Sequence, residues 1–179
     1  MSNSRDQALI ERCRRGDRRA LEQLLGEYER PVYNAAYRIV GNPDDAADVT
    51  QVVFLKAFEQ LDQYKPEFKF FSWIYRIAIN ESINQIKRNR KHLPLDEREV
   101  SDTRSPVDFV GAGDISRGIQ ESLMGLQEDY RTVVVLRHFS ECSYRQISEI
   151  LHIPEKTVKS RLYSARQLMK EQLKGSGIF

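Results

Sequence analysis

Apolar residues recur at helical spacing along most of the chain, and no stretch shows the alternation of a half-buried strand. After Asp17, a residue type that caps helices, apolar positions step by three and four residues until Gly41. Pro31 should bend this helix rather than end it. Asn42 and Pro43 then begin a second predicted helix, with aspartates in its first turn, where the helix dipole favours negative charge. The first part of the chain is therefore predicted to be helical.

The residues from Phe70 to Arg90 repeat this pattern after a predicted loop at Tyr64–Glu67. The pattern then fades between residues 92 and 113, where prolines, glycines and scattered acids predict a linker with little structure. Beyond it, the spacing predicts four compact helices, at about 115–123, 127–138, 144–151 and 156–173. We therefore predict an all-α protein of two small helical domains, residues 1–91 and 115–179, joined by a flexible acidic linker at 92–114.

The composition is that of a soluble protein with a real core. A length of 179 residues fits one ordinary domain or two small ones, and 40% of the residues are hydrophobic while 30% are charged. No run approaches the roughly 18 to 20 apolar residues that cross a bilayer, and residues 1–6 lack the apolar stretch of a secretory signal. We expect a cytoplasmic protein without membrane insertion.

The cysteines and histidines predict neither a disulfide scaffold nor a metal site. Cys13 and Cys142 are the only cysteines, and neither belongs to a CxxC pair. His138 and Cys142 are four residues apart but lack two further ligands for zinc. We expect both thiols to be buried or half-buried in a reducing compartment, without an assigned role, and we expect no metal and no cofactor.

The net charge of +2 averages over segments of opposite sign. Residues 42–62 and 92–115 each carry a net charge of −4, whereas residues 76–91 carry +4 and residues 156–174 carry +5. Two basic segments separated by an acidic one favour two polyanion-binding patches, although a run of charge can also be a solvated face.

The strongest local signal is a helix, a tight turn and a basic helix in residues 143–162. Ser143 can cap the first helix, and Pro154 prevents it from continuing through the turn. Val158 and Leu162 should then face the core, while the outward residues are Thr157, Lys159, Ser160, Arg161, Tyr163 and Arg166. This pattern predicts a helix-turn-helix whose second helix enters the major groove of DNA. The alternative is an ordinary helical hairpin with a charged outer face.

A second constellation interleaves aromatic and polar residues between Phe68 and Arg88. Unstacked bases can lie on aromatic rings, so this composition suits single-stranded DNA. At helical spacing, however, an aromatic stripe can equally be core. Phe70, Ile74 and Ile77 are expected to be core under either interpretation.

Three runs together resemble a known family. Residues 42–58 (NPDDAADVTQVVFLKAF), 71–80 (FSWIYRIAIN) and 157–166 (TVKSRLYSAR) are similar to bacterial sigma-70 family sigma factors of the extracytoplasmic function (ECF) group. The resemblance covers nearly the whole chain outside the linker. It implies a non-enzymatic subunit that binds core RNA polymerase, directs it to promoters and assists strand opening.

The resemblance implies that the first domain corresponds to sigma region 2. Its acidic helix would dock on the clamp helices of the polymerase β′ subunit through Asp45, Asp48, Gln51, Phe54 and Phe58. The alternatives for these acids are a capped, solvated helix start and, more remotely, a metal-dependent nuclease. The following loop and helix would melt the −10 element and hold a flipped base through Lys69, Ser72, Trp73, Arg76, Asn80, Asn84, Lys87 and Arg88. Asn80 and Asn84 are expected to read base edges, and the cations to position the backbone.

Residues 115–174 resemble sigma region 4, which implies that the basic second helix reads the −35 element and that the domain rests on the β-subunit flap. Two departures stand out. Ser164 occupies a position where relatives often have Arg, and Glu155-Lys156 replaces a pair of small residues. A lost Arg removes a candidate guanine or phosphate contact, so the −35 preference cannot be copied from a relative. The linker is expected near the template strand and the RNA exit path.

The family resemblance also implies regulation by an anti-sigma factor and a role in a stress or envelope response. A stand-alone helix-turn-helix regulator is the main alternative, and it predicts tight duplex binding without polymerase, usually as a dimer. A nuclease would instead cleave supercoiled DNA in the presence of magnesium.

Overall fold

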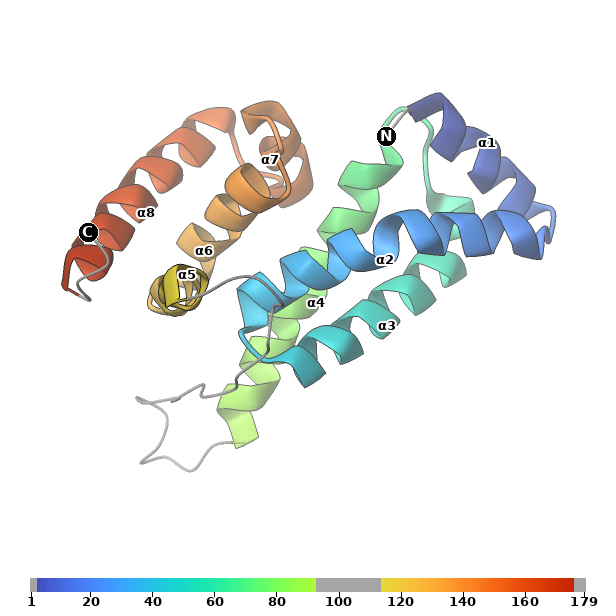
Figure 1. Cartoon of the computed structure of the whole chain (residues 1–179). Coiled ribbons are helices and arrows are strands. Elements are labelled where there is room, and N and C mark those ends of the chain that lie inside the picture. The colour runs from blue at the N-terminus through green and yellow to red at the C-terminus, as the bar shows by residue number, and fades with distance from the viewer. Residues whose placement is uncertain (1–2, 93–113, 176–179) are drawn as a thin grey trace.

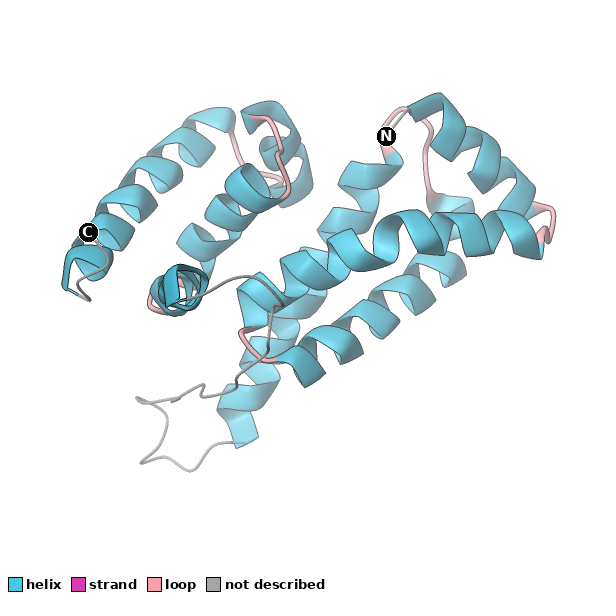
Figure 2. Cartoon of the chain, in the orientation of Figure 1, coloured by secondary structure: helices cyan, strands magenta, loops and turns pink. Residues whose placement is uncertain are grey.

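The computed structural model describes residues 3–92 and 114–175, and all regular structure in these two ranges is helical (Figures 1 and 2). This confirms the all-α prediction. The predicted linker at 92–114 lies, apart from its two end residues, outside the described residues. None of the described helices combines the length and the apolar character that a membrane span needs.

The helices form two groups, one before and one after the linker. The first group consists of α1 (Asn3–Arg14), α2 (Arg18–Val40), α3 (Pro43–Glu59), the short 3₁₀ turn η1 (Leu61–Gln63) and α4 (Phe70–His92). The second group consists of α5 (Asp114–Met124), α6 (Glu128–Val134), the π turn η3 (Val135–Phe139), α7 (Tyr144–Leu151) and α8 (Glu155–Gly175). In Figure 1 the second group lies beside α2 and α4, on the side away from α1.

The start and the end of α2 and the start of α3 lie where the sequence predicted them. Asp17 accepts hydrogen bonds from two backbone amides at the start of α2, at 3.0 and 3.2 Å. Gly41 ends α2 in the left-handed conformation with a φ of 82°. Asn42 then caps α3 by the same kind of contact, at 2.9 and 3.0 Å. Pro31 does not end α2, which continues through it to Val40.

Helix α1 was not predicted, because few of its inward residues are apolar. Leu9 and Ile10 are buried, but the same face also buries Asp6, which is only 3% exposed. The Tyr28 hydroxyl donates a hydrogen bond of 2.7 Å to the Asp6 carboxylate. Arg14 donates to two backbone carbonyl oxygens at η1 and just after it, at 2.9 and 2.7 Å. Polar contacts therefore hold much of α1 in place, and hydrophobic spacing does not reveal them.

The core of the first domain lies between α2, α3 and α4. Tyr28, Phe70 and Ile74 are each at most 2% exposed, and the rings of Tyr28 and Phe70 meet edge to face with centroids 5.2 Å apart. Burying each such side chain contributes about 1.5 to 3 kcal/mol. An ion pair of 2.7 Å between Lys56 and Glu81 joins α3 to α4 near the surface.

In the second domain, residues 128–139 form one continuous helical segment made of α6 and η3. This agrees with the predicted helix at 127–138, although the last turn is a wider π turn rather than an α turn. Val133, Val135 and Leu136 fill the centre of the domain and are inaccessible to solvent.

The predicted helix-turn-helix is confirmed in α7 and α8. Ser143 and Gln146 form a reciprocal capping box: the Ser143 hydroxyl accepts from the Gln146 amide, and the Gln146 side chain accepts from the Ser143 amide. His152 ends α7 in the left-handed conformation, with a φ of 53°. Val158 and Leu162 turn inward from α8 and are at most 1% exposed. The outer face of α8 is thereby fixed toward solvent.

The two domains also pack against each other. Helix α4 lies against α7, and α2 lies against α5, α6 and η3. The buried apolar side chains of both domains form a single cluster. At its centre, the Arg131 guanidinium of α6 donates to the Ile39 carbonyl oxygen of α2 at 2.6 Å. The sequence did not predict this interface.

The capping box makes a prediction about stability. Replacing Ser143 with alanine removes the acceptor for the first turn of α7, so we expect Ser143→Ala to lower the free energy of unfolding by about 1 kcal/mol. Ser164→Ala is the matched control, because Ser164 lies inside α8 and not at a cap. Urea denaturation followed by circular dichroism measures both. Equal stability of the two variants would contradict the role of the box.

Candidate nucleic-acid and partner interfaces

The outer face of α8 carries the predicted −35 residues. Lys159, Ser160, Tyr163 and Arg166 are exposed, and Tyr163 is 68% exposed. Thr157 is half-buried at the start of the helix. The face therefore presents cations, hydroxyls and an aromatic ring on one side of a rigid helix, which is the chemistry needed to contact bases and phosphates in a groove.

All three cations on this face have protein partners, and the Lys159 ammonium lies 6.0 Å from the centre of the Tyr144 ring. Arg161 is half-buried and forms an ion pair with Asp129 of α6, so its guanidinium is engaged before any DNA arrives. Arg166 lies 3.4 Å from the imidazole of His138. Burial, followed by the positive charges of Arg166 and Arg137, lowers the pKa of His138 and keeps its ring neutral. Of the cations predicted to contact −35 DNA, Lys159 and Arg166 are the exposed ones.

The predicted −10 residues lie on α4 and just before it, and they fall into exposed and covered sets. The exposed ones are Lys69, Asn80, Asn84, Lys87 and Arg88. Trp73 is half-buried, and its ring packs on Tyr64 and Phe70 with both centroid distances 5.5 Å. A flipped base could reach the exposed part of this ring, while its packed part anchors α4.

Two of the predicted −10 residues are covered. Ser72 is 2% exposed and belongs to the core of the first domain, because it shares a face of α4 with the buried Tyr75 and Ile79, three and seven residues later. Arg76 is half-buried, and its guanidinium donates a 2.7 Å hydrogen bond to the Glu149 carbonyl oxygen of α7. Burial lowers the pKa of Arg76. In this arrangement neither side chain is free to contact DNA.

Of the residues predicted for polymerase docking, Asp48 and Gln51 lie on the exposed face of α3. Phe54 is 7% exposed and lies in the core, because it follows Val53 on the inward side of the helix. Phe58 is half-buried and stacks on Phe54 with centroids 6.1 Å apart. Asp45 accepts hydrogen bonds from two α4 amide side chains, Gln85 and Asn89, at 2.7 and 2.9 Å. Asp45 therefore also joins α3 to α4.

The solvent-facing stripe of α3 consists of Asp44, Asp48, Gln51, Leu55 and Glu59. Leu55 is 62% exposed, an unusual position for a large apolar side chain. It lies one turn after Gln51 and two turns after Asp48, and this spacing could have revealed it in the sequence. We name these five residues the α3 docking stripe.

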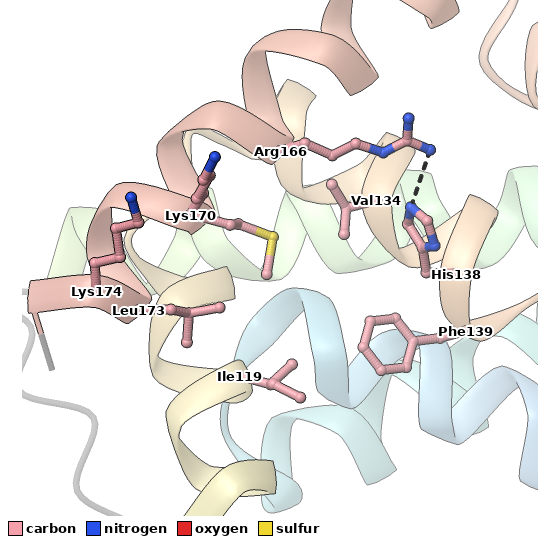
Figure 3. A pocket seen from close by; sticks show the side chains of 9 residues that line it. Ile119, Val134, His138, Phe139, Arg166, Lys170, Leu173 and Lys174 are labelled. Carbon is pink, nitrogen blue, oxygen red and sulfur yellow. Dashed lines mark hydrogen bonds between the residues drawn. The ribbon is translucent and has the colours of Figure 1, made fainter. Parts of the chain in front are cut away.

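An apolar groove of about 820 Å³ opens between α5, η3 and α8 (Figure 3). Its lining residues are Ile119, Val134, His138, Phe139, Arg166, Met169, Lys170, Leu173 and Lys174. In Figure 3 apolar side chains face one another across it, and the α8 cations lie along one edge. The lining comes from three separate stretches of sequence, so spacing along any single helix could not reveal it.

The described residues contain no cluster of three or more metal-ligating side chains. Cys142 is 1% exposed, and burial raises the pKa of its thiol to about 12. Cys13 is half-buried, and burial raises its thiol pKa as well. Both thiols are therefore protonated and poorly nucleophilic at neutral pH.

Two regions of the chain match known protein families. Residues 24–92 match the family described as Sigma-70 region 2, and residues 116–169 match Sigma-70, region 4. The ECF RNA polymerase sigma factor SigW of Bacillus subtilis is 33% identical, over 92% of this chain and 95% of that protein. The RNA polymerase sigma-H factor of Pseudomonas aeruginosa is 31% identical, over 97% of this chain and 96% of that protein.

Solved structures share the fold. CnrH, in complex with the cytosolic domain of CnrY, superposes with a TM-score of 0.74 at 23% identity, covering 96% of this chain and 98% of CnrH. The sigma factor RpoE of Bartonella quintana, in complex with the anti-sigma factor NepR, gives a TM-score of 0.71 at 25% identity, covering 86% of this chain and 96% of that one.

The chain belongs to the ECF group of sigma-70 family RNA polymerase sigma factors. It directs RNA polymerase to promoters and is not an enzyme. This confirms the resemblance found in the sequence, and it excludes the nuclease and the stand-alone regulator as its function.

Proposed function

We propose that this sigma factor binds a promoter at two elements. Helix α8 binds the −35 element and α4 binds the −10 element, while α3 docks on the β′ clamp helices of core polymerase. The domain limits proposed are 1–91 for region 2, 92–114 for the linker and 115–179 for region 4. The observation that carries the proposal is the outward face of α8, which the capping box and the buried Val158 and Leu162 orient away from the core. Promoter DNA lies in the bacterial cytoplasm, so we propose that location.

For the −35 element, the solvent exposure of each side chain indicates which predicted residues of α8 are the stronger candidates for contacting DNA. Lys159 and Arg166 are exposed cations suited to phosphates, whereas Ser160 and Tyr163, which lie between them on α8, present exposed hydroxyl groups. Thr157 is half-buried at the N-terminal end of α8, the end that meets base edges in helix-turn-helix proteins. Arg161 would have to exchange Asp129 for DNA, which makes it a weaker candidate.

For the −10 element, the exposed amides and cations of α4 support single-strand binding. Asn80 and Asn84 lie one turn apart on the same side of the helix, where their amide groups can pair with base edges. Lys87 and Arg88 follow as backbone contacts. The exposed part of the Trp73 ring would stack on an unpaired base.

For polymerase docking, the exposed α3 docking stripe replaces Phe54. Asp48 and Gln51 remain from the predicted set, and Leu55 joins them as the apolar centre of an otherwise polar stripe. An exposed leucine flanked by acids suits a helical partner with a basic rim and an apolar contact point.

The apolar groove of region 4 supports two further partners proposed for this chain. A groove lined by apolar residues and edged by Lys170 and Lys174 suits a helix with one apolar face and acidic flanks. The β-subunit flap is our proposed occupant during initiation. An anti-sigma factor, the kind of protein that accompanies RpoE of Bartonella quintana, is proposed to hold the chain inactive until a stress or envelope signal arrives.

The direct test is run-off transcription with core polymerase on a library of promoters. We expect the mixture to initiate at templates that core enzyme alone ignores, and the selected templates to share a −35 and a −10 element. Initiation at no additional template would refute the proposal.

The −35 assignment predicts the salt dependence of DNA binding. Replacing Lys159 with alanine should lower affinity for a −35 duplex and reduce the slope of log K against log salt by about 0.9, since one phosphate contact is lost. Lys174→Ala is the matched control, because Lys174 lies on the same helix about 22 Å farther along its axis. Fluorescence anisotropy over a range of salt concentrations measures both slopes. An unchanged slope for Lys159→Ala would show that Lys159 makes no phosphate contact.

The docking assignment predicts a role for Leu55. Leu55→Ala should weaken binding to core polymerase about tenfold, because an apolar contact worth about 1 to 2 kcal/mol is lost. Leu168→Ala is the control, since Leu168 is also an exposed leucine but lies on α8. Equilibrium titration of labelled protein with core enzyme measures the affinities. If the two variants lose affinity equally, Leu55 has no special part in docking.

A further inference from the structure

We propose that helix α1 positions the loop between η1 and α4 for contact with the unpaired strand of the −10 element, and that Gln7 and Arg14 are the positioning residues. The inference rests on the proposed role of this loop and of α4 in binding the −10 element. It adds a helix that the proposed DNA contacts do not include, and it adds Phe68 as the aromatic side chain that the loop presents.

The Arg14 side chain holds the backbone at both ends of η1. One terminal nitrogen of its guanidinium donates to the Leu61 carbonyl oxygen at 2.9 Å and to the Tyr64 carbonyl oxygen at 2.7 Å. The other terminal nitrogen donates to the Glu11 carboxylate, one turn earlier in α1, at 2.8 Å. Hydrogen bonds from a charged donor are stronger than those between neutral groups, so this side chain is a firm support for the start of the loop.

Gln7 holds the middle of the loop. Its side-chain amide donates to the Pro66 carbonyl oxygen at 3.0 Å. Gln7 and Arg14 are about two helical turns apart, so they lie on the same side of α1. Helix α1 therefore bonds to three carbonyl oxygens spread over residues 61–66, and Figure 1 shows it beside the loop that leads into α4.

Helix α1 is itself fixed to the rest of the domain, so it can support the loop. Leu9 and Ile10 are at most 4% exposed. The buried Asp6 carboxylate accepts the hydrogen bond from the Tyr28 hydroxyl. Because the Tyr28 ring also packs edge to face on Phe70, this anchor reaches the first residue of α4.

The inner side of the loop is packed, and its backbone closes on itself. Tyr64 is 2% exposed, and its ring lies 5.6 Å from the Phe70 ring and 5.5 Å from the Trp73 ring, measured between centroids. The Tyr64 hydroxyl donates to the Phe68 carbonyl oxygen at 2.6 Å. The Phe68 amide donates to the Lys65 carbonyl oxygen at 3.1 Å. The backbone of residues 64–68 is thus ordered before any DNA binds.

The outer side of the loop carries groups that suit a nucleotide. Phe68 is 46% exposed, and Lys65 and Lys69 on either side of it are exposed. With Glu67, residues 65–69 carry two cations and one anion, a net charge of +1. An exposed ring beside cations suits an unpaired base and its phosphates. A loop supported by α1 presents this ring without first having to be ordered.

Arg14 is placed to support the loop rather than to contact DNA. Its side chain is 22% exposed, and its guanidinium nitrogens lie 2.8 Å from the Glu11 carboxylate and 3.9 Å from the Asp62 carboxylate. Its charge is therefore paired within the protein. An effect of Arg14 on DNA binding should then act through the position of the loop.

Two variants remove the support, and each has a matched control. Arg14→Ala removes both bonds to the ends of η1. Its control is Arg12→Ala, which removes the same charge from the same helix, at a residue that pairs with Asp17. Gln7→Glu replaces a donor by an acceptor of the same shape, so the Pro66 carbonyl oxygen loses its partner. Its control is Gln23→Glu, the same charge change at an exposed position of α2.

Holoenzyme assembled from core polymerase and each variant is titrated with a fluorescein-labelled single strand. The strand carries the −10 sequence of a template selected by run-off transcription. We expect Arg14→Ala to bind it about fivefold more weakly, and Gln7→Glu about threefold more weakly, because the loop must then be ordered during binding. Affinity for a −35 duplex, which α8 contacts, should be the same for all five proteins. Fluorescence anisotropy measures both affinities.

Trp73 gives a second readout, one that a loss of stability alone does not change in the folded protein. It is the only tryptophan of the chain, and its ring packs on Tyr64 of the loop. In the free folded chain, Arg14→Ala should shift the Trp73 emission to longer wavelength, because the displaced loop covers the ring less. Arg12→Ala should leave the emission unchanged. Circular dichroism identifies the folded variants, and Gln7→Glu decides the outcome if Arg14→Ala does not fold.

Weaker −10 binding by Arg14→Ala or Gln7→Glu, with unchanged binding by its matched control, supports the positioning role of α1. Equal affinities for each variant and its control, or a loss that extends equally to the −35 duplex, would overturn it. Either result leaves promoter recognition standing as long as the unmodified holoenzyme initiates at selected templates. Failure of that initiation would instead refute the proposed function, so the two failures are distinguishable.

Discussion

The structure depends on a single buried charge at the junction of two helix ends. The Arg131 guanidinium donates to carbonyl oxygens at the end of α5, in the loop after it and at the end of α2, where carbonyls have few partners within a helix. A buried cation is tolerated only when it is fully hydrogen-bonded. Arg131 therefore fixes the end of α5 relative to α6, and it also brings the end of α2 against the second domain.

Local chemistry explains which parts of this protein could be predicted from sequence. Asp17, Asn42 and Ser143 cap helices through amides two or three residues away, so a short window of sequence contains the whole interaction. Helix α1 could not be found this way, because the buried Asp6 depends on a tyrosine 22 residues away. On α3, the acidic segment was predicted, and the helical spacing of Leu55 from Asp48 and Gln51 could have shown that Leu55 rather than Phe54 shares their face. The contact between Arg131 and Ile39 joins residues 92 positions apart, so the spacing of residues within a single helix cannot predict it.

The protein has no catalytic role, and its exposed helix faces differ in chemistry. The α3 docking stripe is polar with one exposed leucine, whereas the faces of α4 and α8 carry amides, hydroxyls and cations. Each helix buries one side in a common core, so the backbone that carries the exposed side chains is ordered before binding, and only the side chains lose conformational freedom when a partner binds. Arg76 is the exception, because its partner in the structure is the other domain.

The distance between the two domains tests this account most directly. Spin labels at exposed Gln23 of α2 and Gln167 of α8, with both native cysteines replaced, report that distance by double electron–electron resonance. The account predicts one narrow, short distribution for the free chain. A free chain whose domains already show the broad, long distribution of independent bodies would contradict it.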